Sequence, residues 1–299
     1  TLVAGNIAQT PVQNVNTITT ANGTKVGYMQ FNSFISIAQP ELISAVNKFK
    51  SDNIDELVID FRYNGGGLLA LSSQLAYMVA GPANTDDYYY YQTIKNDKQP
   101  QEAPYPFIDR EIDYSTFQTT NSRLPDLNLS KVYVLSTAGT CSASEAFING
   151  LKGIDAEVIL IGDTTCGKPY GFTPTHNCAT TYYTIQFSGA NDKGFGEYAD
   201  GFKPTPSPQF DADVKGCVVA DDFDNKLGDT QERLFSTAIH HIENGSCPIV
   251  VQTNSIKQPS FASQAEQASG IPLSYKQPLY KENMDLTRPS PAKDDNNEQ

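Results

Sequence analysis

The chain is 299 residues long, 39% of them hydrophobic, and its formal net charge is −13. This length allows one large domain or two small ones with a sizeable buried core. The acidic balance argues against nucleic acid or an anionic membrane surface as a partner. No stretch approaches about 18 uninterrupted apolar residues, so the sequence predicts a globular protein without a membrane span.

Strand and helix patterns alternate through the first half of the chain. The polar residues 1–22 indicate a loop, with a short strand at Thr1–Ile7. The apolar spacing that follows predicts, in chain order, a strand at Val26–Phe34, a helix at Pro40–Phe49, a strand at Leu57–Phe61, a helix at Leu68–Val79, a strand at Val132–Ser136, a helix at Ser142–Leu151 and a strand at Glu157–Gly162. This alternation indicates an α/β core, and the nearly continuous apolar runs of the strands are typical of a buried parallel sheet.

Residues 81–130 break this alternation. The segment is rich in Pro, Asp, Asn and Tyr, and we expect an insertion with a hairpin of its own. Its run Tyr88–Tyr91 fits either tyrosines stacked on an edge strand or a lid that faces a substrate. Further on, the pattern predicts an antiparallel strand at Thr180–Ser188, a short strand at Cys217–Asp222 and a helix at Gln231–Ile242, and we expect residues 282–299 to be disordered.

A serine and a lysine stand at two of the predicted junctions. Ser142 opens a helix after a turn of small residues, where the helix dipole and free N–H groups favour a developing negative charge. Lys168 follows the strand Glu157–Gly162 and a glycine turn, 26 residues after Ser142. A serine nucleophile with a lysine base needs this layout, because the amine must arrive from a second element to take the hydroxyl proton.

Both residues also have a purely structural interpretation. Ser142 and Glu145 match the S-x-x-E capping box, and Lys168 could be a surface lysine after a turn. A lysine that acts as a base has to be neutral, and lowering its pKa from ~10.4 to about 7 costs on the order of 4–5 kcal/mol. Desolvation can supply such a shift, and Tyr170 and Phe172 are candidates for the apolar cover.

The glycine run Gly65–Gly67 follows the predicted strand Leu57–Phe61. Glycines there let the backbone approach a ligand closely. A backbone amide of this run, with that of Ala143, would form an oxyanion hole, in which each donor is worth roughly 3–4 kcal/mol of barrier. A tight strand-to-helix turn is the structural alternative and is compatible with that role. We expect Asp60 and Arg62 to hold this loop in place rather than to act chemically.

Taken together, these motifs resemble the C-terminal processing (tail-specific) serine peptidases. Asp60-Phe-Arg-Tyr-Asn-Gly-Gly-Gly-Leu-Leu69, Ser142-Ala-Ser-Glu145 and Thr164-Thr-Cys-Gly-Lys168 occur in the order and spacing of that family. The resemblance spans about Val26 to Lys168. It implies a crotonase-like α/β core and endopeptidase activity on protein or peptide substrates, near their C-termini. It also implies Ser142 as nucleophile, Lys168 as base and an oxyanion hole from Ala143, Gly66 and Gly67, with no cofactor and no metal.

The chain departs from the family pattern at two points. Nothing before the core resembles the family's PDZ module, so we expect that module to be absent or to lie upstream. Phe172 stands four residues after the lysine, where some members carry a Gln that orients it, so the third catalytic group is open. We expect the peptidase domain at residues 1–247, with the insertion at about 82–130 and a C-terminal extension at 248–299.

Three rival hypotheses remain beside the peptidase. The first is a non-catalytic module that binds a ligand or peptide on the same fold. The second is a hydrolase of small esters or amides. The third is a cysteine hydrolase that uses Cys141 with His176 as its base.

The five cysteines favour an oxidising compartment. We predict disulfides Cys166–Cys178 and Cys217–Cys247, with Cys141 left as the free thiol. The alternative is five reduced cysteines in a cytosolic protein. The chain begins at Thr1 without a signal peptide, so we expect a targeting segment to have been removed or to lie upstream. These observations predict a secreted, periplasmic or envelope-attached protein.

Overall fold

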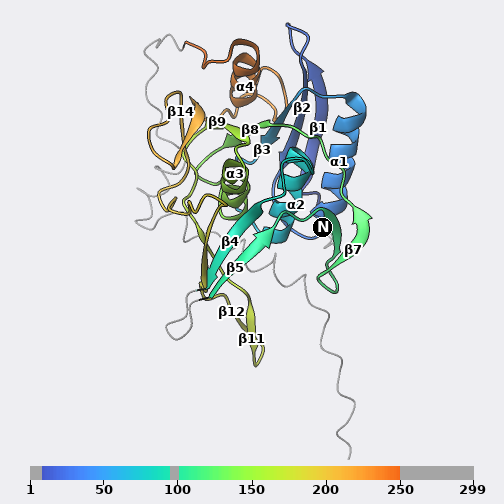
Figure 1. Ribbon diagram of the computed structural model, residues 1–299. Coiled ribbons are helices and arrows are strands. Elements are labelled where there is room, and N and C mark those ends of the chain that lie inside the picture. Colours follow the sequence, from blue (N-terminus) through green and yellow to red (C-terminus); the bar gives the residue numbers. More distant parts are fainter. Residues whose placement is uncertain (1–8, 95–100, 250–299) are drawn as a thin grey trace, which may run out of the picture.

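A seven-stranded sheet forms the centre of the computed structural model, which describes residues 9–94 and 101–249 (Figure 1). Its strands, in spatial order, are β1 (Val12–Thr19), β2 (Lys25–Phe31), β3 (Glu56–Asp60), β8 (Lys131–Ser136), β9 (Glu157–Gly162), β15 (Asp213–Val218) and β14 (Lys203–Thr205). All neighbours pair in parallel except β1, which runs antiparallel to β2. The α/β class expected from the sequence is therefore confirmed.

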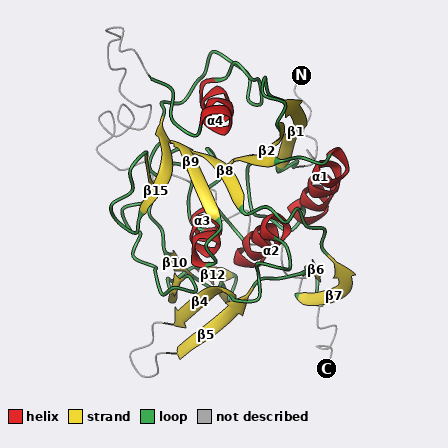
Figure 2. Cartoon of the chain, turned by 45° about the horizontal axis from the view of Figure 1, so that its top comes forward, coloured by secondary structure: helices red, strands yellow, loops and turns green. Residues whose placement is uncertain are grey.

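Helices cover both faces of this sheet (Figure 2). Helices α1 (Ala38–Asp52), α2 (Leu69–Ala80) and α3 (Ala143–Gly153) lie on one face, and α4 (Arg233–Asn244) lies on the other. Alternate residues of the inner strands pack into two separate hydrophobic cores, because successive side chains of a strand point to opposite faces. In β3, for example, Ile59 packs in the α1–α3 core, whereas Val58 packs in the α4 core. Within the described ranges, no helix is long and apolar enough to cross a membrane.

The elements predicted from Val26 to Gly162 in the α/β alternation are found within a few residues of their expected ends. Three other predictions are wrong or only partly right. Residues 12–19 form β1 rather than a loop; a register irregularity between Gln13 and Asn16 interrupts the apolar alternation that would have revealed a strand. The expected strand Thr180–Ser188 is divided between β12 (Thr180–Tyr182) and β13 (Phe187–Ala190). The strand expected at Cys217–Asp222 begins earlier, as β15. The predictions for residues 1–7 and 282–299 lie outside the described residues.

The insertion contains two hairpins. Strand β4 (Tyr88–Ile94) pairs with β5 (Gln101–Pro106), and β6 (Arg110–Asp113) pairs with β7 (Gln118–Arg123). Strand β4 also pairs with β13, which in turn pairs with the short β10 (Tyr170–Gly171), so these strands form a second sheet in the order β10-β13-β4-β5. The edge-strand interpretation of the tyrosine run is wrong, because β4 lies between β13 and β5, and the lid interpretation remains a prediction. Tyr89 is buried against the helices, whereas Tyr88 is exposed on the strand.

A buried arginine connects the loop after β3 to helix α4. The Arg62 guanidinium has no solvent exposure, and it pairs with Asp60, Asp221 and Glu232 at 2.9 Å each. Glu232 is also the N-cap of α4, where its carboxylate accepts the N–H groups of the first turn. Asp60 and Arg62 thus hold the loop, as expected from the sequence.

We predict that Glu232→Ala destabilises the fold by about 3–5 kcal/mol, because it leaves the Arg62 charge partly uncompensated in the core. Glu157→Ala is the matched control, since the Glu157–Lys215 pair is about half exposed on both sides. Removing an exposed pair of this kind changes stability by only about 0–1 kcal/mol. Denaturant unfolding of the two variants measures the difference. Equal losses of stability in the two variants would contradict the role of the buried Arg62–Glu232 pair in holding the fold together.

Candidate active site

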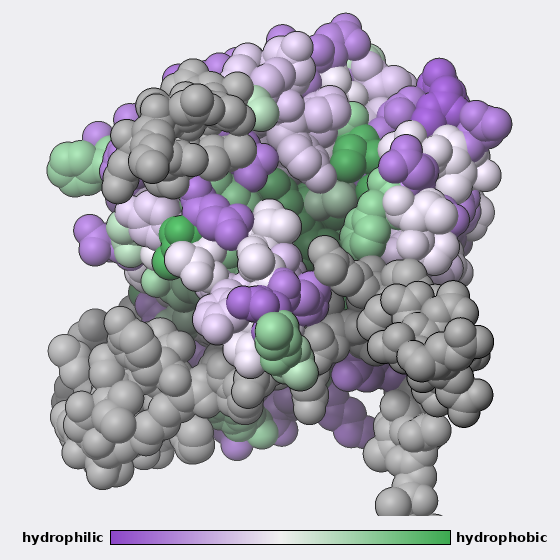
Figure 3. Space-filling view, turned by 90° about the horizontal axis from the view of Figure 1, so that it is seen from below, coloured by the Kyte–Doolittle hydropathy of each residue, from purple (hydrophilic) through white to green (hydrophobic). Residues whose placement is uncertain are grey.

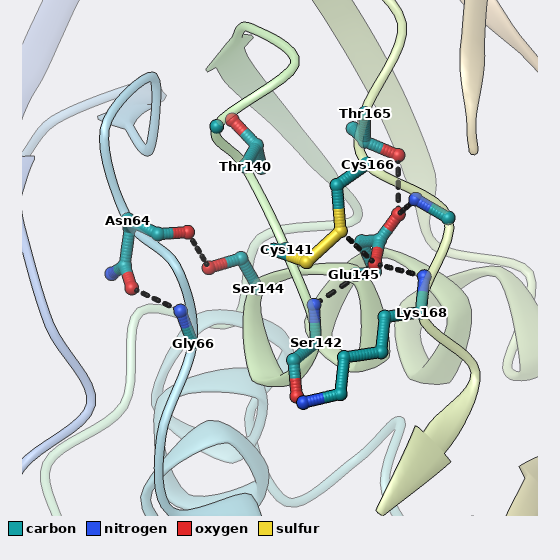
Figure 4. Close-up of a disulfide and its surroundings, with 12 residues drawn as sticks. Asn64, Gly66, Thr140, Cys141, Ser142, Ser144, Glu145, Thr165, Cys166 and Lys168 are labelled. Carbon is teal, nitrogen blue, oxygen red and sulfur yellow. Dashed lines mark hydrogen bonds between the residues drawn. A yellow bond between two sulfur atoms is a disulfide. The ribbon is translucent and has the colours of Figure 1, made fainter. Parts of the chain in front are cut away.

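Three loops meet at one edge of the sheet because they follow three neighbouring parallel strands. The glycine loop follows β3, the turn into α3 follows β8, and the lysine loop follows β9. The carboxyl ends of parallel strands all face the same edge, which is where ligand sites form in open α/β sheets. Residues more than 70 positions apart, such as Gly66 and Ser142, therefore lie together (Figure 4).

Ser142 occupies the N-cap position of α3 in an unusual backbone conformation. Its φ is 57° and its ψ is −111°, a region that favours glycine. A non-glycine residue in such a region costs on the order of 1–3 kcal/mol and persists where the surrounding structure enforces it, often at functional sites. The side chain is half-buried, and Figure 4 shows its hydroxyl pointing toward the amine of Lys168.

Lys168 brings a half-buried amine to this hydroxyl. Burial lowers the pKa of the amine, and the nearby Glu145 carboxylate partly opposes that shift. The Phe172 ring lies 5.0 Å from Nζ, measured to the ring centroid. Phe172 therefore supplies apolar cover at the position where a glutamine side chain would offer a hydrogen bond.

Glu145 connects the serine turn to the lysine loop. Its buried carboxylate accepts the backbone N–H groups of Ser142, Gly167 and Lys168 at 2.7–2.9 Å and the Thr165 hydroxyl at 2.6 Å. Burial raises the pKa of this carboxyl, and the four hydrogen bonds lower it. The capping-box motif indicated only the contact with Ser142. The contacts with the lysine loop lie 20 to 23 residues away in sequence, and no spacing rule signals them.

The glycine loop lies directly against the serine turn. A Cβ on Gly66 would come within 2.8 Å of the Ala143 nitrogen, so only glycine allows this approach. The Gly66 N–H donates to the Asn64 side chain at 2.9 Å. The Ala143 N–H belongs to the first turn of α3, where the backbone donors have no partner within the helix. The Gly66 N–H is therefore engaged within the loop, whereas Gly67 lines the same pocket as Ala143.

The disulfide prediction is half right. Cys217–Cys247 is confirmed, but Cys166 pairs with Cys141 and not with Cys178, which is exposed and free. Cys141 and Cys166 follow β8 and β9, so the parallel pairing brings their Cα atoms to 5.2 Å. Cys178 lies instead in the turn of the hairpin formed by β11 (Thr175–Asn177) and β12. The short sequence separation between Cys166 and Cys178 was therefore a poor guide.

The Cys141–Cys166 pairing also tests the hypothesis that the protein is a cysteine hydrolase. The Cys141 sulfur is bonded to Cys166 and offers no thiol nucleophile, so that hypothesis is wrong for this oxidised form. Among the described residues, the one cluster with the spacing of a metal site is Cys141, Glu145 and Cys166. Its two sulfurs are bonded to each other, which leaves the buried carboxylate alone as a ligand.

An apolar pocket of about 390 Å³ opens beside Ser142 and Lys168. Seen from below, the molecular surface has a hollow lined with hydrophobic residues (Figure 3). Besides the two candidate catalytic residues, the pocket is lined mainly by apolar and aromatic side chains. They come from α2, α3, the second sheet and neighbouring loops, and they include Leu68, Leu69, Tyr90, Ala146, Phe187 and Tyr198. His176 also lines it, and its Nδ1 lies 2.8 Å from the Thr181 hydroxyl.

An α/β sheet that carries a helix-capping serine and a half-buried lysine at its carboxyl edge places the protein among candidate serine-type hydrolases. The chain belongs to peptidase family S41, a family of serine-type peptidases, because the family model matches residues 25–185. That match includes the glycine loop, the serine turn and the lysine loop.

Curated relatives agree with this assignment. The chain is 28% identical over 147 residues to a carboxyl-terminal-processing protease of Picosynechococcus. The matched segment covers 49% of this chain and 30% of the relative. It is also 28% identical over 144 residues to a probable CtpA-like serine protease of Staphylococcus aureus, across 48% of this chain and 25% of the relative. The chain thus matches about a quarter to a third of the length of these relatives.

A solved structure shows the same fold. The putative S41 protease of Bacteroides fragilis superposes with a TM-score of 0.66 at 24% identity. The superposition covers 81% of this chain and 60% of the other.

We predict that Ser142→Gly is more stable than Ser142→Ala by about 1 kcal/mol, because glycine relieves the positive φ and is also the better N-cap of the two. Both variants remove the hydroxyl, so the comparison isolates the backbone. Thermal or denaturant unfolding measures the difference. An alanine variant as stable as the glycine variant would show that the turn is not strained.

Proposed function

We propose that this protein is a serine endopeptidase that cleaves peptide bonds of protein substrates, with Ser142 as nucleophile and Lys168 as its base. The observation that carries this proposal is the convergence of the serine hydroxyl and a half-buried amine at the mouth of an apolar pocket. A capping serine alone would not need the lysine. A surface lysine alone would have no reason to be buried beside the serine.

The mechanism follows from the positions of the groups. The neutral Lys168 amine takes the Ser142 proton, and Oγ attacks the peptide carbonyl. The Ala143 and Gly67 N–H groups stabilise the oxyanion, with Gly66 shaping the loop that holds them. Lys168 then protonates the leaving amine, and an acyl-enzyme remains on Ser142. The same amine activates the water that hydrolyses it.

The pocket suggests which side chain precedes the scissile bond. Leu69, Tyr90 and Phe187 give its walls an apolar character, and Ala146 lies one turn along α3 from the nucleophile. Its volume is in the range of pockets that enclose a small organic group. We propose that an apolar side chain of the substrate occupies it.

The two disulfides support an extracytoplasmic location, because such bonds persist in oxidising compartments. We propose a periplasmic, secreted or envelope-attached enzyme. The boundary of the peptidase domain at residue 247 remains a prediction.

One observation favours a second candidate. The Phe172 ring covers the Lys168 amine, and aromatic faces attract the protonated, not the neutral, form of an amine. A protein that kept this lysine charged would bind peptides on the same surface without cleaving them. Labelling of Ser142 by a fluorophosphonate, located by peptide mapping, separates the two candidates, since only an activated serine reacts.

We predict that Ser142→Ala abolishes both peptide hydrolysis and fluorophosphonate labelling. The fold should survive, because loss of an N-cap side chain costs only about 0.5–2 kcal/mol. Circular dichroism checks the fold, and hydrolysis of a fluorogenic peptide checks the activity. Ser144→Ala is the control, since its hydroxyl bonds the Asn64 carbonyl instead of facing the pocket. A fully active Ser142→Ala protein would rule out this nucleophile.

We predict that Lys168→Arg is inactive, because the guanidinium remains protonated at any working pH. In the wild type, kcat/KM should rise with pH as the amine loses its proton. This limb should lie below the ordinary lysine range, because burial lowers the pKa of Lys168. A pH–rate profile measures its position. An active arginine variant, or a rate that shows no rise with pH anywhere up to the ordinary lysine range, would exclude Lys168 as the base.

A further inference from the structure

The Cys141–Cys166 disulfide joins the two candidate catalytic loops next to the reacting groups. Cys141 directly precedes Ser142, and Cys166 lies two residues before Lys168 (Figure 4). Within the described ranges it is the one covalent link between the turn after β8 and the loop after β9 other than the chain itself. The other bridge, Cys217–Cys247, connects β15 to the segment after α4.

The remaining links between these loops are hydrogen bonds. The Cys166 N–H donates to the Thr140 carbonyl at 3.0 Å, which joins the lysine loop to the serine turn. The Cys141 N–H donates to the Asn64 carbonyl at 3.0 Å and joins the serine turn to the glycine loop instead. Glu145 adds the contacts to Ser142 and Lys168 described above. The Cys166 sulfur lies 3.5 Å from Glu145 Oε2, so the bridge contacts the carboxylate that holds both loops.

We infer that the Cys141–Cys166 disulfide is a positioning element of the active site, so that the enzyme acts in its oxidised form and loses activity when a dithiol reduces this bond. The inference rests on the proposed function of Ser142 and Lys168. The bridge acts on them by fixing the loops that carry them, and neither sulfur takes part in hydrolysis.

The reduction is a two-electron exchange with a dithiol. One thiolate of the dithiol attacks a sulfur of the bridge and forms a mixed disulfide, which releases the other cysteine as a thiolate that takes up a proton. The second thiol of the reagent displaces the remaining cysteine, and the reagent leaves as its own disulfide. Both Cys141 and Cys166 are only half-buried, so the reagent has a route to the bond.

Reduction changes the surroundings of Glu145 as well as the tether. A thiol at Cys166 is a hydrogen-bond donor, whereas a bonded sulfur is not. It would compete with the backbone N–H groups of Ser142 and Lys168 for Oε2 of the same carboxylate. A displacement of about 1 Å at a reacting group can cost on the order of 100-fold in rate, so a small shift of either loop suffices.

The lysine supplies a readout that a simple loss of stability would not change. If the loop loosens, the amine gains solvent and its pKa rises toward the ordinary value, so the alkaline rise in activity moves to higher pH. The titratable groups that surround this amine and the pocket are Glu145, Tyr90, Tyr170, His176 and Tyr198. None of them bonds to the bridge except Glu145 through its contact with Cys166.

The test measures the rate of fluorophosphonate labelling of Ser142 in the full chain, with Cys178→Ser throughout to prevent exchange with the exposed thiol. Dithiothreitol with a metal chelator should lower the rate at least about tenfold, and reoxidation should restore it. Circular dichroism should report a folded protein throughout, and mass spectrometry should assign the opened bond. The pH dependence of labelling should move to higher pH on reduction.

Two matched variants separate positioning from stability. Cys141→Ala/Cys166→Ala should label as slowly as the reduced protein and should not respond to dithiothreitol; alanine avoids a second hydroxyl beside the nucleophile. Cys217→Ala/Cys247→Ala should have a lower melting temperature but the labelling rate of the oxidised protein. A folded Cys141→Ala/Cys166→Ala protein that labels at the oxidised rate would overturn the inference. So would an unchanged rate in protein whose Cys141 and Cys166 thiols are shown to be free.

Hydrogen exchange distinguishes a failure of the disulfide inference from a failure of the proposed function of Ser142 and Lys168. Reduction should speed amide exchange at residues 166–168, whose N–H groups are held by Thr140 and Glu145 in the oxidised form. Faster exchange there, without labelling of Ser142 in any state, would refute the serine nucleophile and retain the link between bridge and loop. Unchanged exchange in the reduced protein would refute the link itself.

Discussion

The parallel pairing of β3, β8 and β9 is the constraint on which the site depends. Each strand ends at the same edge of the sheet, so the three loops that follow them meet without any sequence proximity. Each loop contributes a different kind of group: backbone N–H donors, a hydroxyl and an amine. The two apolar cores fix the strands, and through them the spacing of the loops. The packing of the two cores therefore also determines the geometry of the site.

Glu145 converts that rough convergence into defined geometry. A buried carboxylate is unfavourable by itself and is tolerated where hydrogen bonds satisfy its oxygens. Here the donors come from both sides of the site, so relieving the desolvation of Glu145 requires the serine turn and the lysine loop to be in place together. The same negative charge opposes the fall in the pKa of Lys168 that burial causes. Burial and the nearby anion therefore act in opposite directions on the protonation of the same amine.

The sequence predicts the core elements well because their apolar runs are long and their helix starts carry recognisable signals. It predicts β1 poorly, since a register irregularity at Gln13–Asn16 hides the alternation. The motifs around Ser142 and Lys168 identify these two residues as a candidate pair from the sequence alone. The contacts of Glu145 with the lysine loop, and the pairing of Cys141 with Cys166, depend on which strands are neighbours. Strand order is a property of the whole sheet, and a local pattern does not contain it.

The long sequence separation between Arg62 and Glu232 bears on how the protein folds during its synthesis. The glycine loop emerges from the ribosome early, but one of the three carboxylates that pair with Arg62 belongs to the N-cap of α4, 170 residues later. Until that residue is available, the nascent chain has an incompletely compensated charge beneath the loop, which opposes its burial. Domains fold as units during synthesis, and in this one the set of Arg62 partners is complete only when Glu232 has been made. Full charge compensation beneath the glycine loop thus requires nearly all of the described chain.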